Sequence, residues 1–273
     1  MGPLLALASA VCYGIVDFAG GLLSRRAHFA AVTFLGQVGG LLLAVTAALL
    51  LPADVLRPLD LLWGALSGIG SGAAMHFLNR GLSHGAMSVV VPVSAVTGVT
   101  LSVVCGVALG DRPTALAWLG IALAAPALWM VCGGGADGGE GVPDGLLASA
   151  GVALQYIALA QAGASSGLWP VAAGRVAAVL VLLPVAARHP RRLRLPPVRA
   201  LQALLVGAGA ALALILYLLA ARLQLLAVAV VLASLYPALP VILGLALLHE
   251  RLSGKQTAGL LVAGLATVLL SLG

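Results

Sequence analysis

The sequence predicts an all-α integral membrane protein in which ten transmembrane helices form two inverted five-helix repeats. Three observations lead to this expectation. The 273 residues are 62% hydrophobic and only 8% charged, whereas a soluble domain of this length needs a charged surface. The apolar residues fall into ten segments of roughly 17–24 residues, the length that a helix needs to cross the hydrocarbon core of a bilayer. Finally, one short phrase between two apolar segments occurs twice.

The repeated phrase marks the same turn in each half of the chain. Residues 109–114 read Leu-Gly-Asp-Arg-Pro-Thr, and 139 positions later residues 248–253 read Leu-His-Glu-Arg-Leu-Ser. In both copies the hydroxyl residue can cap the helix that follows, and the acid can lie near the positive N-terminal end of that helix. Ser253 and Gln256 also have the spacing of a capping box. Duplicated helical units in a membrane are typical of secondary transporters.

The ten expected spans are bounded by charges, prolines and glycine clusters. They lie at about 3–23, 30–51, 59–80, 86–109, 114–132, 144–163, 167–187, 199–220, 225–248 and 255–272. In the third span Gly64, Gly68 and Gly72 recur at every fourth residue. This spacing predicts a flat face for close packing against another helix.

A glycine-rich, acidic linker at residues 133–143 divides the chain into a first repeat, 1–132, and a second repeat, 144–273. Because each repeat holds five spans, an odd number, the second must enter the membrane from the opposite face. An inverted pair of this kind has its binding site near the midplane, between the repeats. Most basic residues, including an Arg-rich stretch at 188–199, follow odd-numbered spans, which predicts cytoplasmic odd loops and external termini.

Composition excludes several classes of function. The net charge of +6 comes from short loops, where basic residues contact lipid headgroups, so we expect no nucleic-acid partner. The three cysteines are unclustered, which argues against a disulfide framework, a metal site or a cofactor. The chain has no HExxH, paired aspartates or CxxC. Ser71 and His76 point about 140° apart on one helix and cannot form a catalytic dyad. We therefore expect no enzyme.

The two phrases are accompanied by Tyr13-Gly14 in the first span and Leu235-Tyr236-Pro237 in the ninth. This ordered set resembles the drug/metabolite transporter superfamily, specifically its ten-helix EamA-type branch, and the resemblance covers the whole chain. It implies a secondary carrier of small metabolites, amino acids or drugs, often an exporter. The second phrase departs from the family pattern, because His249 stands where the family commonly has Gly.

The same resemblance bears on mechanism. The related four-helix multidrug exporters are similar to each repeat without its first helix, and their functional carboxylate would fall near Gln37 and Arg175 here. Neither residue is a carboxylate, so the proton-exchange mechanism of those exporters does not transfer directly.

Two ionisable residues, Asp17 and Arg175, lie near the middle of expected spans. A charge at the bilayer centre costs roughly 2.5–3.5 kcal/mol on insertion scales, so each needs a reason. On the functional interpretation, Arg175 attracts an anionic group, and Asp17 attracts a cation or a proton. On the structural interpretation, the two form a salt bridge between the repeats, or Asp17 reaches toward Arg25.

Uncharged polar residues complete the candidate substrate or proton pathway, although any of them can instead join two helices by a hydrogen bond. When the second and seventh spans are superposed on Gly36 and Gly174, Gln37 aligns with Arg175. The candidate set is Gln37, His76, Asn79, Gln155, Tyr156, Tyr217, Ser234 and Tyr236.

The function we expect is secondary active transport, in the export direction, of small metabolites, amino acids or drugs by alternating access. The chain would act as a monomer, spanning the bacterial inner membrane many times, with a proton as the candidate coupling ion. A lipid or lipid-linked-sugar flippase on the same fold is the alternative, and an intramembrane enzyme is a remote one.

Overall fold

The computed structural model describes residues 2–108, 112, 114–132, 139–188, 193–223 and 236–272, and the regular structure of these residues is helical throughout. They contain ten α-helices and one 3-10 turn, η1 (Ala164–Ser166). The helices are α1 (Gly2–Arg26), α2 (Phe29–Leu50), α3 (Pro58–His84), α4 (Met87–Ala108), α5 (Ala115–Cys132), α6 (Val142–Ala160), α7 (Trp169–Arg188), α9 (Pro197–Leu223), α11 (Ala238–Leu247) and α12 (Gly254–Leu272).

Within the described residues, seven helices are long and apolar enough to cross a membrane, namely α1 to α4, α6, α7 and α9. The apolar helices α5, α11 and α12 are shorter. The predicted fold class, an all-α bundle of membrane-spanning helices, is confirmed. Of the expected ninth span, 225–248, only the part from residue 236 lies within the described residues, and it contains α11. Most of the first repeated phrase, Leu109–Asp111 and Pro113, lies outside them.

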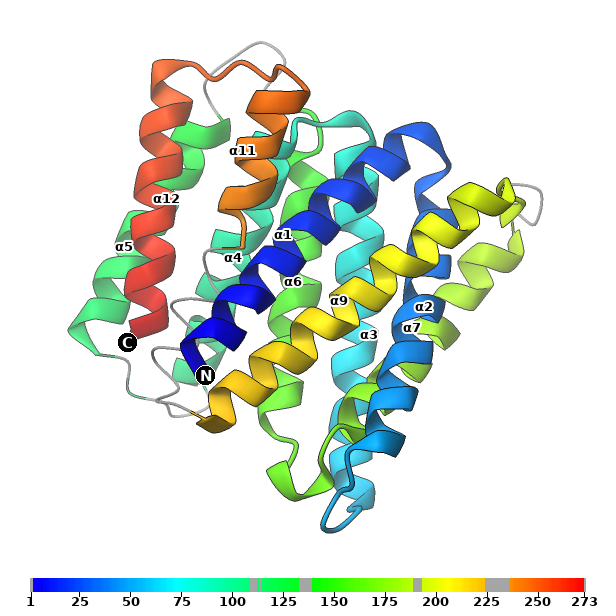
Figure 1. Ribbon diagram of the computed structural model, residues 1–273. Helices are drawn as coiled ribbons and strands as arrows, with labels where there is room; N and C mark the ends of the chain where they lie inside the picture. Colours follow the sequence, from blue (N-terminus) through cyan, green and yellow to red (C-terminus); the bar gives the residue numbers. More distant parts are fainter. Residues whose placement is uncertain are drawn as a thin grey trace.

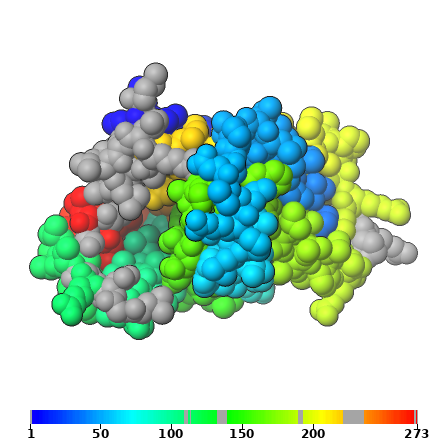
Figure 2. Space-filling model, turned by 90° about the horizontal axis from the view of Figure 1, so that it is seen from below, coloured from blue at the N-terminus to red at the C-terminus, as the bar shows by residue number. Residues whose placement is uncertain are grey.

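The helices run up and down, so the loops lie alternately at two ends of the bundle. Both termini lie at one end, together with the α2–α3 and α6–α7 loops (Figure 1). We call this the termini end. The opposite end, which we call the hinge end, holds the α1–α2, α3–α4 and α11–α12 connections (Figure 1). Seen from the termini end, the α2–α3 loop lies beside the α6–α7 connection (Figure 2).

Helices of each repeat pack against the corresponding helices of the other repeat. Helix α3 of the first repeat packs against α6 and α7 of the second, and its counterpart α9 packs against α1 and α2 of the first. Likewise α4 contacts α6, while α11 contacts α1. The pairs α2 with α7 and α5 with α12 join counterparts directly. Interchanging the repeats therefore reproduces these main contacts, as expected for an inverted pair related by a pseudo-two-fold axis.

Glycines form the two equivalent crossings of this arrangement. A side chain at Gly68 of α3 would overlap the backbone of Gly174 in α7, and one at Gly207 of α9 would overlap the backbone of Gly36 in α2. Gly207 lies 139 positions after Gly68, the offset of the repeated phrase. At Gly64 a Cβ atom would likewise meet the backbone of α7. The predicted packing face of α3 is thus confirmed, and it consists of backbone against backbone.

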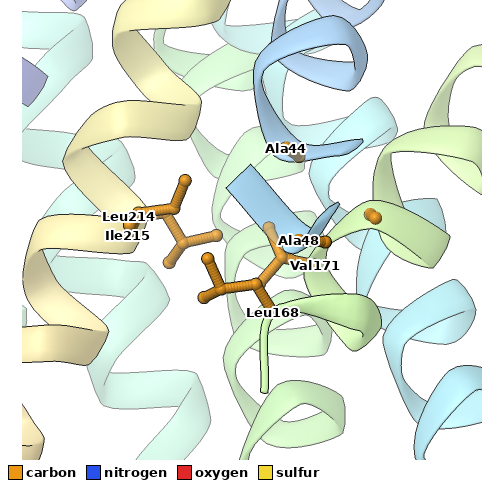
Figure 3. Packing of buried hydrophobic residues seen from close by; sticks show 7 residues of the cluster. Ala44, Ala48, Leu168, Val171, Leu214 and Ile215 are labelled. Atoms are coloured by element: carbon orange, nitrogen blue, oxygen red, sulfur yellow. The ribbon is translucent and has the colours of Figure 1, made fainter. Parts of the chain in front are cut away.

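Apolar clusters lie on either side of the bundle's middle. Toward the termini end, Ala44 and Ala48 of α2 pack with Leu168, Val171, Leu214 and Ile215 (Figure 3). Toward the hinge end, Leu78 and Leu82 of α3 pack with Met87, Val90, Val91 and Ala148. The buried residues Asp17 of α1, Gln37 of α2 and Arg175 of α7 lie between these two layers.

Candidate functional site

The centre of the bundle holds an arginine that bonds across the two repeats. Arg175 of α7 donates a hydrogen bond from Nη1 to Oε1 of Gln37 in α2, at 2.8 Å. Both side chains are buried, with 5% and 3% of their surface exposed. Among the described residues no carboxylate lies within 4.0 Å of Arg175. The salt bridge to Asp17, which was the structural interpretation, is therefore not formed in this conformation.

A small cavity adjoins this guanidinium. Its volume is about 20 Å³, and Thr33, Gln37, Asn79 and Arg175 supply its polar lining. A space of this size holds one water molecule and no organic solute. Within the described residues, this cavity therefore leaves no room for an organic solute beside Arg175.

Helix α3 carries three polar residues on one face, namely His76, Asn79 and Arg80. Of these, only Asn79 lines the cavity beside Arg175. It donates from Nδ2 to Oγ1 of Thr33 at 3.0 Å. The ring of His76 packs edge-on against Phe29 at 5.2 Å, and its Nδ1 is buried without a hydrogen-bond partner in the described structure. Arg80 lies nearer the hinge end and is 3.6 Å from the carboxylate of Asp144.

Asp17 of α1 occupies a second buried position. It is 6% exposed, and in the described part of the chain its carboxylate has no hydrogen bond or ion pair. The candidate residues Tyr156 and Tyr236 both interact with it electrostatically, and Tyr217 interacts with Tyr156. Tyr156 and Tyr236, which are far apart in sequence, are thus both near Asp17, and Tyr217 is near Tyr156.

Tyr13 belongs to the same group, although it is not among the candidate site residues predicted from the sequence. Its ring centroid lies 5.9 Å from that of Tyr236, and it interacts electrostatically with both Asp17 and Arg175. The sequence did hold a signal for it, since residues four apart on a helix share a face and Tyr13 precedes Asp17 by four.

The two remaining candidates are Gln155 and Ser234. Gln155 is half-buried, and its backbone carbonyl accepts a hydrogen bond from Ser67 at 2.9 Å. Ser234 lies outside the described residues. No group of three or more His, Cys, Asp or Glu side chains that could hold a metal ion occurs in the described ranges.

The comparison with protein families identifies the chain. A model described as the EamA-like transporter family matches residues 1–133 and 141–272, one match in each half. The chain belongs to the EamA-like transporter family. It is a multi-pass membrane transporter of the drug/metabolite transporter superfamily. No curated protein matches the chain.

In this EamA-like transporter the second copy of the repeated phrase joins the two repeats at the hinge end. Glu250 accepts hydrogen bonds from the backbone N–H groups of Met87, at 2.9 Å, and Ser88, at 3.0 Å. Arg25, at the end of α1, lies 3.3 Å from the same carboxylate and also donates to the carbonyl of Gly85. Glu250 thus caps α4 of the first repeat, in addition to preceding α12 in the sequence.

The predicted capping box is confirmed in the next turn. Ser253 and Gln256 exchange hydrogen bonds at 2.9 and 3.2 Å at the start of α12. With these groups already satisfied locally, the carboxylate of Glu250 is left to bond to α4. Burial alone would raise the pKa of Glu250, but the bonds from Ser88, Met87 and Arg25 outweigh burial and hold that pKa below its usual value.

A different set of bonds joins the repeats at the termini end. The carboxylate of Asp60, in the first turn of α3, accepts from the backbone N–H of Gly163 at 2.9 Å and from the hydroxyl of Ser166 at 2.6 Å. In the adjoining loop, the backbone N–H of Asp54 donates to the carbonyl of Ser165 at 3.0 Å. Acidic residues therefore connect the two repeats at both ends of this EamA-like bundle.

Proposed function

We propose that this EamA-like protein is a secondary active transporter that exports small organic solutes, such as metabolites, amino acids or drugs, across the bacterial inner membrane by alternating access. The observation that carries the proposal is the hydrogen bond between Arg175 and Gln37, where a buried arginine that has no carboxylate partner among the described residues joins the two repeats. A buried charge in a membrane protein is costly and is kept where function needs it.

The moving parts that we propose are the two repeats, residues 1–132 and 144–273, connected by the linker 133–143. The contacts of Glu250 at the hinge end and of Asp60 at the termini end both join the repeats. Opening one set while keeping the other would expose the centre to one side of the membrane at a time. In this mechanism Asp17 is the group that takes up a proton or a cationic part of the substrate, and one chain suffices.

A stabilisation screen followed by a transport assay tests the proposal. Purified protein is first screened for solutes that raise its melting temperature, among amino acids, cationic drugs and nucleosides, because a ligand that binds the folded state stabilises it. Each hit is then offered to proteoliposomes, with Arg175→Ala as the variant and empty liposomes as the control. We expect uptake by the wild-type protein and loss of uptake in a variant that still folds.

Two results would contradict the proposal. If no solute crosses the proteoliposome membrane while fluorescent phospholipids are moved between leaflets, the chain is a flippase. If Arg175→Ala transports like the wild-type protein, the central arginine has no part in the substrate pathway.

A further inference from the structure

We propose that Asp17 and the four tyrosines of the chain form a binding site for an organic cation. We call Asp17, Tyr13, Tyr156, Tyr217 and Tyr236 the tyrosine site. This inference rests on the proposed transport function and deepens it, because it names the chemical class of the substrate. Asp17 alone could pair with any cation or with a proton, but the tyrosine rings beside it favour an organic cation.

One side of the site is built on α1. Tyr13 and Asp17 are one helical turn apart, so their side chains leave the same face of the helix. Tyr236, just before α11, lies against this face. Its ring centroid is 5.9 Å from that of Tyr13, and its carbonyl oxygen would be 3.0 Å from a Cβ atom placed on Gly14. The two tyrosines thus come from different repeats and touch beside the carboxylate.

The other side comes from α6 and α9. Tyr156 interacts electrostatically with Asp17 and Tyr217, and Tyr13 interacts with Tyr156 and Tyr217. Tyr156 nevertheless keeps 38% of its surface exposed, so packing leaves part of the residue available for a ligand. Because α6 and α9 belong to the second repeat and α1 to the first, the site draws on both repeats.

The gathering is specific to tyrosine. The chain contains four tyrosines and four tryptophans, and all four tyrosines belong to this one group. By contrast, Trp118 and Trp129 of α5 are 53% and 71% exposed on the outside of the bundle. A tyrosine ring offers both a face that attracts cations and a hydroxyl that can hydrogen-bond.

The charge of the site calls for a cation. Asp17 is 94% buried, from its exposure of 6%, and within the described structure it has neither a donor nor a counter-ion. Arg175, the other buried charge at mid-bundle, is engaged by Gln37. A positively charged ligand would supply the missing counter-charge. One carboxylate with aromatic side chains near it suits an organic ammonium, whereas metal cations such as Ca²⁺ need several oxygen ligands.

Binding of phenyltrimethylammonium to the full chain in lipid nanodiscs, followed by calorimetry, tests the site. This probe carries a permanent charge, and 2-phenylethanol serves as the uncharged comparison. We expect Asp17→Asn to weaken binding at least about tenfold, and Tyr156→Leu to weaken it about fivefold, as loss of a cation–π contact predicts. Tyr156→Phe keeps the ring and should stay within about twofold of the wild-type affinity.

Matched controls separate the site from the rest of the molecule. Asp54→Asn removes a carboxylate from an exposed loop, and Trp129→Leu removes a lipid-facing ring. Neither should change the affinity. If Asp17→Asn fails to fold, the comparison of Tyr156→Leu with Tyr156→Phe decides the question. Equal binding by all variants, or equal binding of 2-phenylethanol, would overturn the proposal and identify the signal as partition into lipid.

Failure of this inference is distinguishable from failure of the transport proposal. If the protein transports another solute, and phenyltrimethylammonium neither binds nor competes with it, the tyrosine site is not a cation site while transport stands. If the probe binds in a manner that depends on Asp17 but no solute crosses the membrane, the site stands and the proposed transport fails.

Discussion

Arg175 and Gln37, which share a hydrogen bond of 2.8 Å, occupy equivalent positions in the two repeats. They follow Gly174 and Gly36, which lie in the equivalent crossings of α3 with α7 and of α9 with α2. Two residues related by a two-fold axis can touch only close to that axis. The guanidinium therefore marks the pseudo-two-fold axis of the bundle, and the replacement of one Gln by Arg places a single positive charge there.

This asymmetry yields a test of the charge at the axis. Arg175→Gln would give two glutamines at equivalent positions, which can still hydrogen-bond but carry no charge. We expect the melting temperature to change by only a few degrees, and transport of a substrate with an anionic group to fall at least about tenfold, the effect of losing about 1.4 kcal/mol of interaction. Wild-type transport by this variant in proteoliposomes would show that the charge is dispensable.

The glycine crossings predict a matched pair of stability effects. Gly68→Ala and Gly207→Ala would each press a methyl group into the backbone of the facing helix, and overpacking of this kind costs about 1–3 kcal/mol. Gly264→Ala in α12 is the control, because nothing lies within 4 Å of the position of its added Cβ. Thermal unfolding in detergent should show lower melting temperatures for the first two variants only. A loss for one crossing but not the other would mean that the crossings are not energetically equivalent.

The fold could be predicted from the sequence because its signals are local. Apolar segments of membrane-spanning length predicted the helices, and the spacing of Gly64 and Gly68 predicted the flat face of α3. The capping box of Ser253 and Gln256 also depends on neighbours three residues apart. Each of these features needs no knowledge of which helix lies beside which.

The contacts of the centre could not be predicted in the same way. The alignment of Gln37 with Arg175 gave equivalent positions, but only the placement of the axis brings the two side chains together. Likewise Glu250 follows the expected pattern of an acid before a helix, yet it bonds to α4, which is more than 160 residues away in sequence. A short motif does not reveal a competing donor in a distant helix.

The cap supplied by Glu250 predicts a stability that depends on pH. Because its pKa is held below the usual value, its contribution is fully present above the unfolded-state pKa of about 4.3 and is lost as the pH falls through the lower folded-state pKa. We expect Glu250→Gln to cost about 1–2 kcal/mol at neutral pH, as for the loss of a helix cap. The gap in melting temperature between variant and wild type should narrow as the pH falls through this lower folded-state pKa.

Glu140→Gln is the control for this experiment, because Glu140 is exposed and should leave the melting temperature unchanged at either pH. A gap for Glu250→Gln that stays constant from neutral to acid pH would contradict the role of the carboxylate charge. In that case the stability that Glu250 contributes would come from the shape of its side chain and not from its charge.

The last prediction concerns the orientation of the bundle in the membrane. Leu272 lies at the termini end, and Pro196 precedes α9 at the hinge end, beside the Arg-rich stretch. Since basic loops stay in the cytoplasm, the termini end should face outward. In a variant without the native cysteines, an impermeant thiol reagent applied to intact cells should label Leu272→Cys and leave Pro196→Cys unlabelled until the cells are opened. Labelling of Pro196→Cys alone in intact cells would show that the orientation is the opposite one. The hinge end, with the contacts of Glu250, would then face outward.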